Sequence, residues 1–180
     1  MYLKINNPDI SEELINIIDE ELESILQVKE NIIFQKYAKL DFQNWTKIGL
    51  QELRIKNPNK LKTTILGMIS LALNKVRGYH LRIMQIIAIL LFIHKEPNYG
   101  LIEEIATGEG KSCIISSLSI FYALNGHKVD IISSSYTLAQ RDSEEFKELY
   151  SYFNLTTGYP SNSRSGPYKT DILIYLLIIF

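Results

Sequence analysis

Apolar side chains recur every three or four positions along the first part of the chain, which is the period of an amphipathic helix. The first run predicts a helix over about 9–29, with Asp9 as its N-cap and Glu12 as the reciprocal partner. Its apolar positions are Leu14, Ile15, Ile18, Leu22, Ile25 and Leu26. The acidic run at 19–21 has the pattern of a solvated helix face, because adjacent helical residues diverge by about 100° and cannot converge on one metal ion.

Three more helices are predicted before residue 77, and they lie over 31–39, 45–53 and 60–76. A turn is expected at 41–44, and Asn57-Pro58-Asn59 breaks the chain. Trp45 is interpreted as a packing residue. Residues 1–76 are therefore expected to form an all-helical N-terminal segment in which we find no residues that carry chemistry.

Short apolar runs alternate with helical ones in the rest of the chain. Helices are predicted over 80–94, 111–125 and 136–151, and strands over 100–105, 128–133, 155–159 and from 171 onward. This alternation is typical of βαβ units and a parallel sheet. The predicted fold class is α/β, with a partial, truncated parallel sheet over residues 77–180 preceded by the helical segment 1–76. The apolar end of the chain, 173–180, is interpreted as a truncation or a changed reading frame, with a buried strand as the alternative.

The composition narrows the classes of protein that this chain can belong to. Apolar residues make up 46% of its 180 residues, which supports a substantial core and argues against global disorder. The net charge of −1 gives no bulk attraction to nucleic acid or to a membrane surface. No apolar run approaches the ~20 residues that span a bilayer. The single cysteine, Cys113, excludes an internal disulfide and fits a reducing, cytoplasmic compartment.

The segment Ile105-Ala-Thr-Gly-Glu-Gly-Lys-Ser112 stands between a predicted strand and a predicted helix, as a phosphate-binding loop (P-loop) does. Gly108 and Gly110 let the backbone curl so that several N–H groups converge, and the following helix adds the partial positive charge of its N-terminus. Lys111 supplies a charge for phosphates, and the Ser112 hydroxyl is placed to hold Mg²⁺. The usual pattern begins with a glycine where this chain has Ile105, so an ordinary glycine turn that caps a helix is the alternative.

A glutamine, Gln85, interrupts the apolar helix at 80–94, 26 residues before Lys111. A buried glutamine needs partners for its amide, and in nucleotide-binding folds an adenine edge can provide them. The alternative is a surface position on the helix. Farther along, Arg141-Asp142 is interpreted as a structural ion pair rather than as a catalytic one.

Several motifs in this order resemble the first nucleotide-binding half of the SecA family of preprotein translocase motors. They are Gln85, the loop 106–112, Leu138-Ala-Gln-Arg-Asp142, Leu155-Thr-Thr-Gly158 and Tyr168-Lys-Thr-Asp-Ile172. The resemblance covers about residues 78–172. It departs from the family at Ser135-Tyr136-Thr137, where the family has Asn-Asp-Tyr, and after Ile172, where the family continues with a polar segment.

The resemblance implies a RecA-like, DEAD-type domain that uses ATP and Mg²⁺ to move unfolded preprotein through a membrane translocon. Gln85 would contact adenine, and the loop would hold the phosphates through Thr107, Gly108, Glu109, Gly110, Lys111 and Ser112, with Ser112 also on the metal. No residue is assigned a catalytic role. The resemblance also implies a cytoplasmic protein at the periphery of a membrane.

In that family the acidic pair that completes the site, and the second motor half, lie beyond the position matching residue 180. We therefore expect weak ATP binding and negligible hydrolysis by the chain alone. Two other functions remain open. One is a fragment of a DEAD-like nucleic-acid helicase, although nucleic-acid binding is not favoured by the charge. The other is a non-enzymatic interaction module formed by the N-terminal helices.

Overall fold

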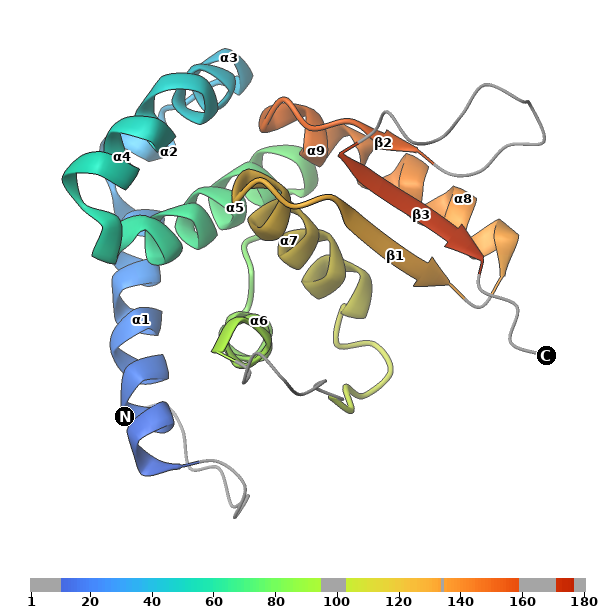
Figure 1. Ribbon diagram of the computed structural model, residues 1–180, viewed down its shortest axis with the longest axis horizontal. Helices are drawn as coiled ribbons and strands as arrows, with labels where there is room; N and C mark the ends of the chain where they lie inside the picture. Colours follow the sequence, from blue (N-terminus) through green and yellow to red (C-terminus); the bar gives the residue numbers. More distant parts are fainter. Residues whose placement is uncertain (1–10, 95–102, 134, 159–170, 177–180) are drawn as a thin grey trace.

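The computed structural model describes residues 11–94, 103–133, 135–158 and 171–176, with only the backbone for 173–176. Its helices are α1 (Glu12–Glu30), α2 (Ile32–Gln35), α3 (Lys39–Asn44), α4 (Leu50–Lys56), α5 (Leu61–Arg77), α6 (Ile83–His94), α7 (Lys111–Leu124), α8 (Tyr136–Glu145) and α9 (Lys147–Tyr152). Its strands are β1 (Val129–Ser133), β2 (Thr157–Gly158) and β3 (Ile172–Leu176). Helices predominate, and the strands lie together at one side (Figure 1).

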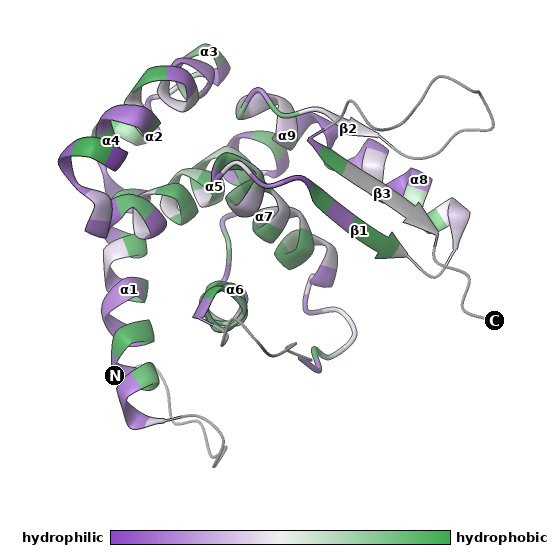
Figure 2. Cartoon of the chain, viewed as in Figure 1, coloured by the Kyte–Doolittle hydropathy of each residue, from purple (hydrophilic) through white to green (hydrophobic). Residues whose placement is uncertain are grey.

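Helix α5 forms the centre of the molecule and is buried on all sides. Every residue from Thr63 to Leu73 is buried, so this helix has no solvent face along that stretch. Helix α1 crosses it, and α7 and α9 pack on it from the other part of the chain. One apolar core thus runs from α1 through α5 to the helices beside the sheet. The hydropathy colouring shows the same concentration of apolar residues along α5 and α6 (Figure 2).

The crossing of α1 and α5 depends on a glycine inside a helix. A Cβ atom placed on Gly67 would lie 2.4 Å from Cγ1 of Val28 and 2.5 Å from its Cβ. Glycine costs about 1 kcal/mol relative to alanine inside a helix. Here it allows the two helices to approach closely, which is the gain that offsets this cost.

Two of the predicted boundaries in the helical segment need correction. The side chain of Ser11, not that of Asp9, accepts a hydrogen bond from the N–H of Leu14 and caps α1; Asp9 itself lies outside the described residues. The predicted turn at 41–44 is part of helix α3, because the Asp41 carboxylate accepts from the N–H of Ala38 at 2.7 Å and fixes the start of that helix.

The chain between α3 and α5 stays helical almost throughout. A π-helical turn over Trp45–Gly49 continues α3 into α4, and a short 3₁₀ turn over Pro58–Lys60 precedes α5. Trp45 is buried, which confirms its prediction as a packing residue. The break expected at 57–59 is therefore a change of helix direction with little intervening loop.

Within the described residues, the sheet consists of three parallel strands in the order β1-β3-β2. Val129 is level with Ile172 in one pair, and Thr157 is level with Ile172 in the other. The carboxylate of Asp171 joins the beginnings of the strands, because it accepts from the N–H and hydroxyl of Thr156 at 2.9 and 2.7 Å and lies 3.5 Å from Nζ of Lys128. A larger RecA-like sheet stays a prediction.

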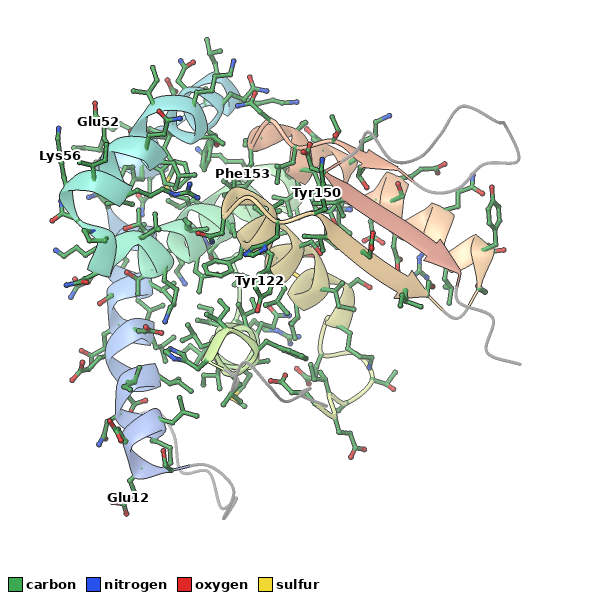
Figure 3. The ribbon with its side chains drawn as sticks, viewed as in Figure 1. Glu12, Glu52, Lys56, Tyr122, Tyr150 and Phe153 are labelled. Carbon is green, nitrogen blue, oxygen red and sulfur yellow. The ribbon has the colours of Figure 1, made fainter. Side chains whose placement is uncertain are left out.

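The structure changes two more predictions in this part of the chain. The described end of the expected strand 100–105 has no regular secondary structure, and 100–102 lie outside the described residues. The expected helix 136–151 is divided at Phe146 into α8 and α9. Tyr150 and Phe153 (Figure 3) are both buried in the core at the end of this helical pair.

Candidate functional site

The candidate phosphate-binding loop is a tight turn directly before α7. The N–H of Glu109 donates to the carbonyl of Ala106 at 3.3 Å and closes the turn. Gly108 and Gly110 have φ angles of +89° and +79°, in the left-handed region that favours glycine. Helix α7 begins at Lys111, so the first helical amides point toward the loop, where the helix dipole favours an anion.

The Lys111 side chain folds back over this turn. Its ammonium donates to the carbonyl of Ile105 at 3.0 Å and to that of Ala106 at 3.2 Å. The positive charge therefore sits at the N-terminal end of α7, against two neutral acceptors. A phosphate would be a stronger acceptor for this ammonium than a carbonyl, because its negative charge adds Coulomb attraction to the hydrogen bond.

Gln85 links helix α6 to the loop and is 5% exposed, which decides against the alternative of a surface position. Its Nε2 donates to the carbonyl of Glu109 at 2.8 Å, and its Oε1 accepts from the N–H of Arg82 at 3.0 Å. An amide side chain has two N–H groups and two lone pairs, so each end has capacity for one further bond. A role in adenine binding stays a prediction.

Sequence reasoning missed Arg82, which braces the same loop from outside. Its Nη2 donates to the carbonyl of Glu109 at 2.7 Å and lies 3.2 Å from the carboxylate of that residue. Both side chains are more than half exposed, so this ion pair contributes little to stability. Its effect is positional, since Arg82 and Gln85 hold one carbonyl of the loop from one end of α6. An arginine three residues before Gln85 was the only available signal.

The remaining predicted site residues surround the loop. Thr107 and Glu109 are exposed beside the turn, and Ser112 is half-buried in the first turn of α7. The chemistry of this set fits a polyphosphate, because it joins an ammonium, two left-handed glycines and a helix N-terminus. The Ser112 hydroxyl is the group predicted to hold Mg²⁺, and the Thr107 hydroxyl and the Glu109 carboxylate in the same set also offer oxygen atoms. Among the residues the structure describes, no group of three His, Cys, Asp or Glu side chains could hold a metal ion.

A groove of about 380 Å³ lies beside the loop, between α7 and β1. Ile105 and Lys111 line its loop end, and Ile131 and Ile132 line the strand. Sequence reasoning also missed Glu103, which lines this groove. Burial raises the pKa of the Glu103 carboxyl to about 7. The sequence predicted a strand here, and alternate residues of a strand can face solvent, so nothing distinguished Glu103 from an ordinary polar position of that strand.

Three other side chains named in the sequence analysis, Arg141, Asp142 and Cys113, lie outside the loop. Arg141 and Asp142 form the predicted ion pair, with Nη2 and Oδ1 2.7 Å apart on the surface of α8. Cys113 is buried in α7, as expected for a small apolar residue, and burial raises the pKa of its thiol to about 11. A thiol with so high a pKa stays protonated and unreactive.

Sequence comparisons relate the chain to known proteins. The family model of the SecA DEAD-like domain matches residues 7–176. Similar curated proteins include the protein translocase subunit SecA of Chlorobaculum tepidum, 42% identical over 79 residues, and those of Clostridium beijerinckii and Pelagibacter ubique, 36% and 38% identical over 78 residues. Each alignment covers 41% of this chain and 8–9% of the relative. None of the described helices is long and apolar enough to cross a membrane.

Proposed function

Because the chain belongs to the SecA DEAD-like domain family, we propose that it forms the ATP-binding portion of a protein-translocation motor. The loop 106–112 binds the phosphates of Mg-ATP at the start of α7. In this proposal the site residues are Gln85 at the base and Thr107, Gly108, Glu109, Gly110, Lys111 and Ser112 around the phosphates. The whole motor's activity and partners belong to the proposal, since the aligned part covers less than a tenth of the curated relatives.

The observation that best supports this function is the position of the Lys111 ammonium. It is held over the loop by the carbonyls of Ile105 and Ala106, at the end of a helix whose first amides face the same side. A bound phosphate would accept from both the ammonium and these amides. Lys111 would then exchange its two carbonyl acceptors for phosphate oxygens without leaving the loop.

Ser112, the residue directly after Lys111, would complete the site through its hydroxyl. Mg²⁺, when bound, neutralises phosphate charge and takes oxygen ligands from the protein and the phosphates. Ser112 is the proposed metal ligand among the loop residues that offer such an oxygen. Gln85 and Arg82 keep the carbonyl of Glu109 turned toward α6, and so hold the loop's glycines in their left-handed conformation.

We propose further that hydrolysis by this chain alone is slow. Phosphoryl transfer needs an acidic group to hold the metal and orient water, and a cation to stabilise the transition state. Within the described residues, Lys111 and Ser112 supply only part of that set. In the assembled motor, unfolded preprotein and a membrane translocon would be the partners, with the helical segment 1–76 and the nucleotide-binding unit 77–180 as the two parts of this chain.

A binding measurement with a matched lysine control tests the function. We expect Lys111→Ala to weaken Mg-ATP binding by isothermal titration calorimetry at least tenfold, because charged hydrogen bonds contribute about 1.5–3 kcal/mol. Lys56→Ala is the control, since Lys56 is exposed on α4 far from the loop (Figure 3). Equal affinities for the parent and Lys111→Ala would contradict the proposal, provided that both unfold at similar temperatures.

A further inference from the structure

Arg82 holds two oxygen atoms of Glu109 on one side of the loop. Its Nη2 donates to the carbonyl of Glu109 at 2.7 Å and lies 3.2 Å from the carboxylate atom Oε2 of the same residue. Gln85 donates to that carbonyl as well, at 2.8 Å, so both lone pairs of the carbonyl oxygen are used. The carbonyl and the carboxylate of Glu109 therefore both face the start of α6, where Arg82 and Gln85 stand.

The same contacts fix the direction of one amide in the loop. A trans peptide is planar, and its C=O and N–H groups point in opposite directions. The described residues contain no cis peptide bond. Because the carbonyl of Glu109 faces α6, the N–H of Gly110 points away from α6. The guanidinium stays close to this peptide, since a Cβ atom on Gly110 would lie 3.7 Å from Nη2 of Arg82.

The charges of the loop itself do not favour an anion. Residues 103–112 contain three glutamates, Glu103, Glu104 and Glu109, and one lysine, Lys111. Glu109 is the nearest of these acids to the lysine along the chain, and the Cα atoms of residues two apart are separated by at most roughly 7 Å. Salt screens charges over about 8 Å at physiological ionic strength, so a charge on Glu109 is only partly screened. Without a partner, Glu109 would repel the phosphates that Lys111 attracts.

The charge of Arg82 also reaches the first turn of α7. Burial raises the pKa of the Cys113 thiol to about 11, and the positive charge of Arg82 acts in the opposite direction, because a nearby cation favours the thiolate. The guanidinium therefore adds positive potential at the end of α7 that follows the loop. Both side chains of the Arg82–Glu109 pair are more than half exposed, so the pair adds little to stability and can be removed without unfolding the chain.

We propose that Arg82 is the counter-ion that allows this loop to bind a polyphosphate: it neutralises Glu109 and holds the carboxylate toward α6, while the phosphates meet Lys111 and the N–H of Gly110. This inference rests on the proposed function, since it concerns the affinity of the same loop. Arg82 is a positioning residue here, because it acts through Glu109 and does not touch the phosphates. Its effect grows with the charge of the ligand, because the repulsion that it removes does so.

Calorimetric titration of the full chain with Mg-ATP tests this role, with another exposed ion pair as the control. Lys56 and Glu52 pair on α4 away from the loop (Figure 3), and their side chains are 68% and 60% exposed, against 56% and 52% for Arg82 and Glu109. In about 20 mM salt, where screening is weak, we expect Arg82→Met to weaken binding at least fivefold and Lys56→Met less than twofold. Arg82→Lys keeps the charge and should stay within twofold of the parent.

A second substitution tests whether Arg82 acts through the charge of Glu109. In the Arg82→Met background, Glu109→Gln should recover at least threefold in affinity, whereas Glu52→Gln should leave the affinity unchanged. Loss of the fold cannot produce such a rescue, because the second substitution restores no contact. The loss caused by Arg82→Met should also shrink in about 300 mM salt, and it should be smaller for Mg-ADP than for Mg-ATP.

Three results would overturn the inference. They are equal affinities of the parent and Arg82→Met in low salt, no rescue by Glu109→Gln, and weaker binding by Glu109→Gln in the parent background, which would make the carboxylate a ligand of the metal instead. Lys111→Ala separates this inference from the proposed function. If Lys111→Ala weakens binding and Arg82→Met does not, the proposed function stands and the role of Arg82 falls. No binding of Mg-ATP by the parent would overturn both.

Discussion

Replacing Gly110 by alanine probes the contact between α6 and the loop directly. A Cβ atom at this position would lie 2.5 Å from Nε2 of Gln85, far closer than such atoms approach. Gln85 cannot move aside freely, because it is buried and its amide is bonded to Glu109 on one side and Arg82 on the other. Gly108 offers the matched control, since its φ angle is also positive but nothing lies within 4 Å of its added Cβ.

Both substitutions place alanine in a left-handed conformation, and only Gly110→Ala also displaces the Gln85 side chain. Alanine in the left-handed region costs about 1 kcal/mol at either site. At Gly110 the alanine also displaces Gln85 from the carbonyl of Glu109, and a lost internal hydrogen bond costs about 1 kcal/mol more. We therefore expect Gly108→Ala to lose about 1 kcal/mol of unfolding free energy and Gly110→Ala about 2 kcal/mol. For a domain of this size these losses lower Tm by about 3 °C and about 6 °C.

Thermal unfolding followed by circular dichroism measures both losses. A double-mutant cycle with Gln85→Ala isolates the shared term, because removing the Gln85 side chain removes the atom that the new Cβ would meet. Gly110→Ala should cost only about 1 kcal/mol in that background. Equal losses at Gly108 and Gly110, or no coupling between Gly110→Ala and Gln85→Ala, would refute the described position of Gln85 against the loop.

Two further predictions concern charged groups in the core and the groove. The Glu103 pKa of about 7 lies above its ordinary value of 4.5, so the fold disfavours the ionised carboxylate, and the parent loses stability as the pH rises through this window. The advantage of Glu103→Gln over the parent in urea unfolding should therefore grow between pH 5 and pH 8. A difference in unfolding free energy that does not change with pH would contradict this. Glu104→Gln is its control. Glu21 accepts from Nζ of Lys62 at 2.7 Å and lies 2.8 Å from Nε2 of His94, joining α1 to α5 and α6, so Glu21→Ala should cost about 2 kcal/mol in urea unfolding. The exposed neighbour Glu20 should cost less than about 0.5 kcal/mol when changed to alanine, and similar losses at both positions would count against the cluster.

The sequence predicted those elements whose signal is local. Helices α1, α5 and α7 follow clear periods of apolar residues, and Ser135 caps α8 through the N–H of Leu138, as expected of a serine at that place. The glycine turn before α7 could also be predicted, because Gly108 and Gly110 can adopt the left-handed conformation that a tight turn needs.

The errors came from features that local patterns do not contain. Asp41 is a turn former by composition, yet its carboxylate can equally cap a helix, and only the position of the N–H of Ala38 decides between the two. The strand expected before the loop depends on a neighbouring strand, and one segment's periodicity cannot reveal its neighbours. The roles of Glu103 and Arg82 depend on their neighbours in space, the groove for Glu103 and the carbonyl of Glu109 for Arg82. Charge and spacing along the chain do not show these neighbours.

The glycine at the crossing of α1 and α5 ties together two positions that are 39 residues apart. Any larger residue at 67 requires a smaller one at 28, and a larger residue at 28 would find no space while α5 lies so near. Homologous chains that keep this interhelical distance should therefore change the two sites jointly, as a compensating pair. Where both grow, the helices must separate, and the shape of the surface that α1 presents would change with them.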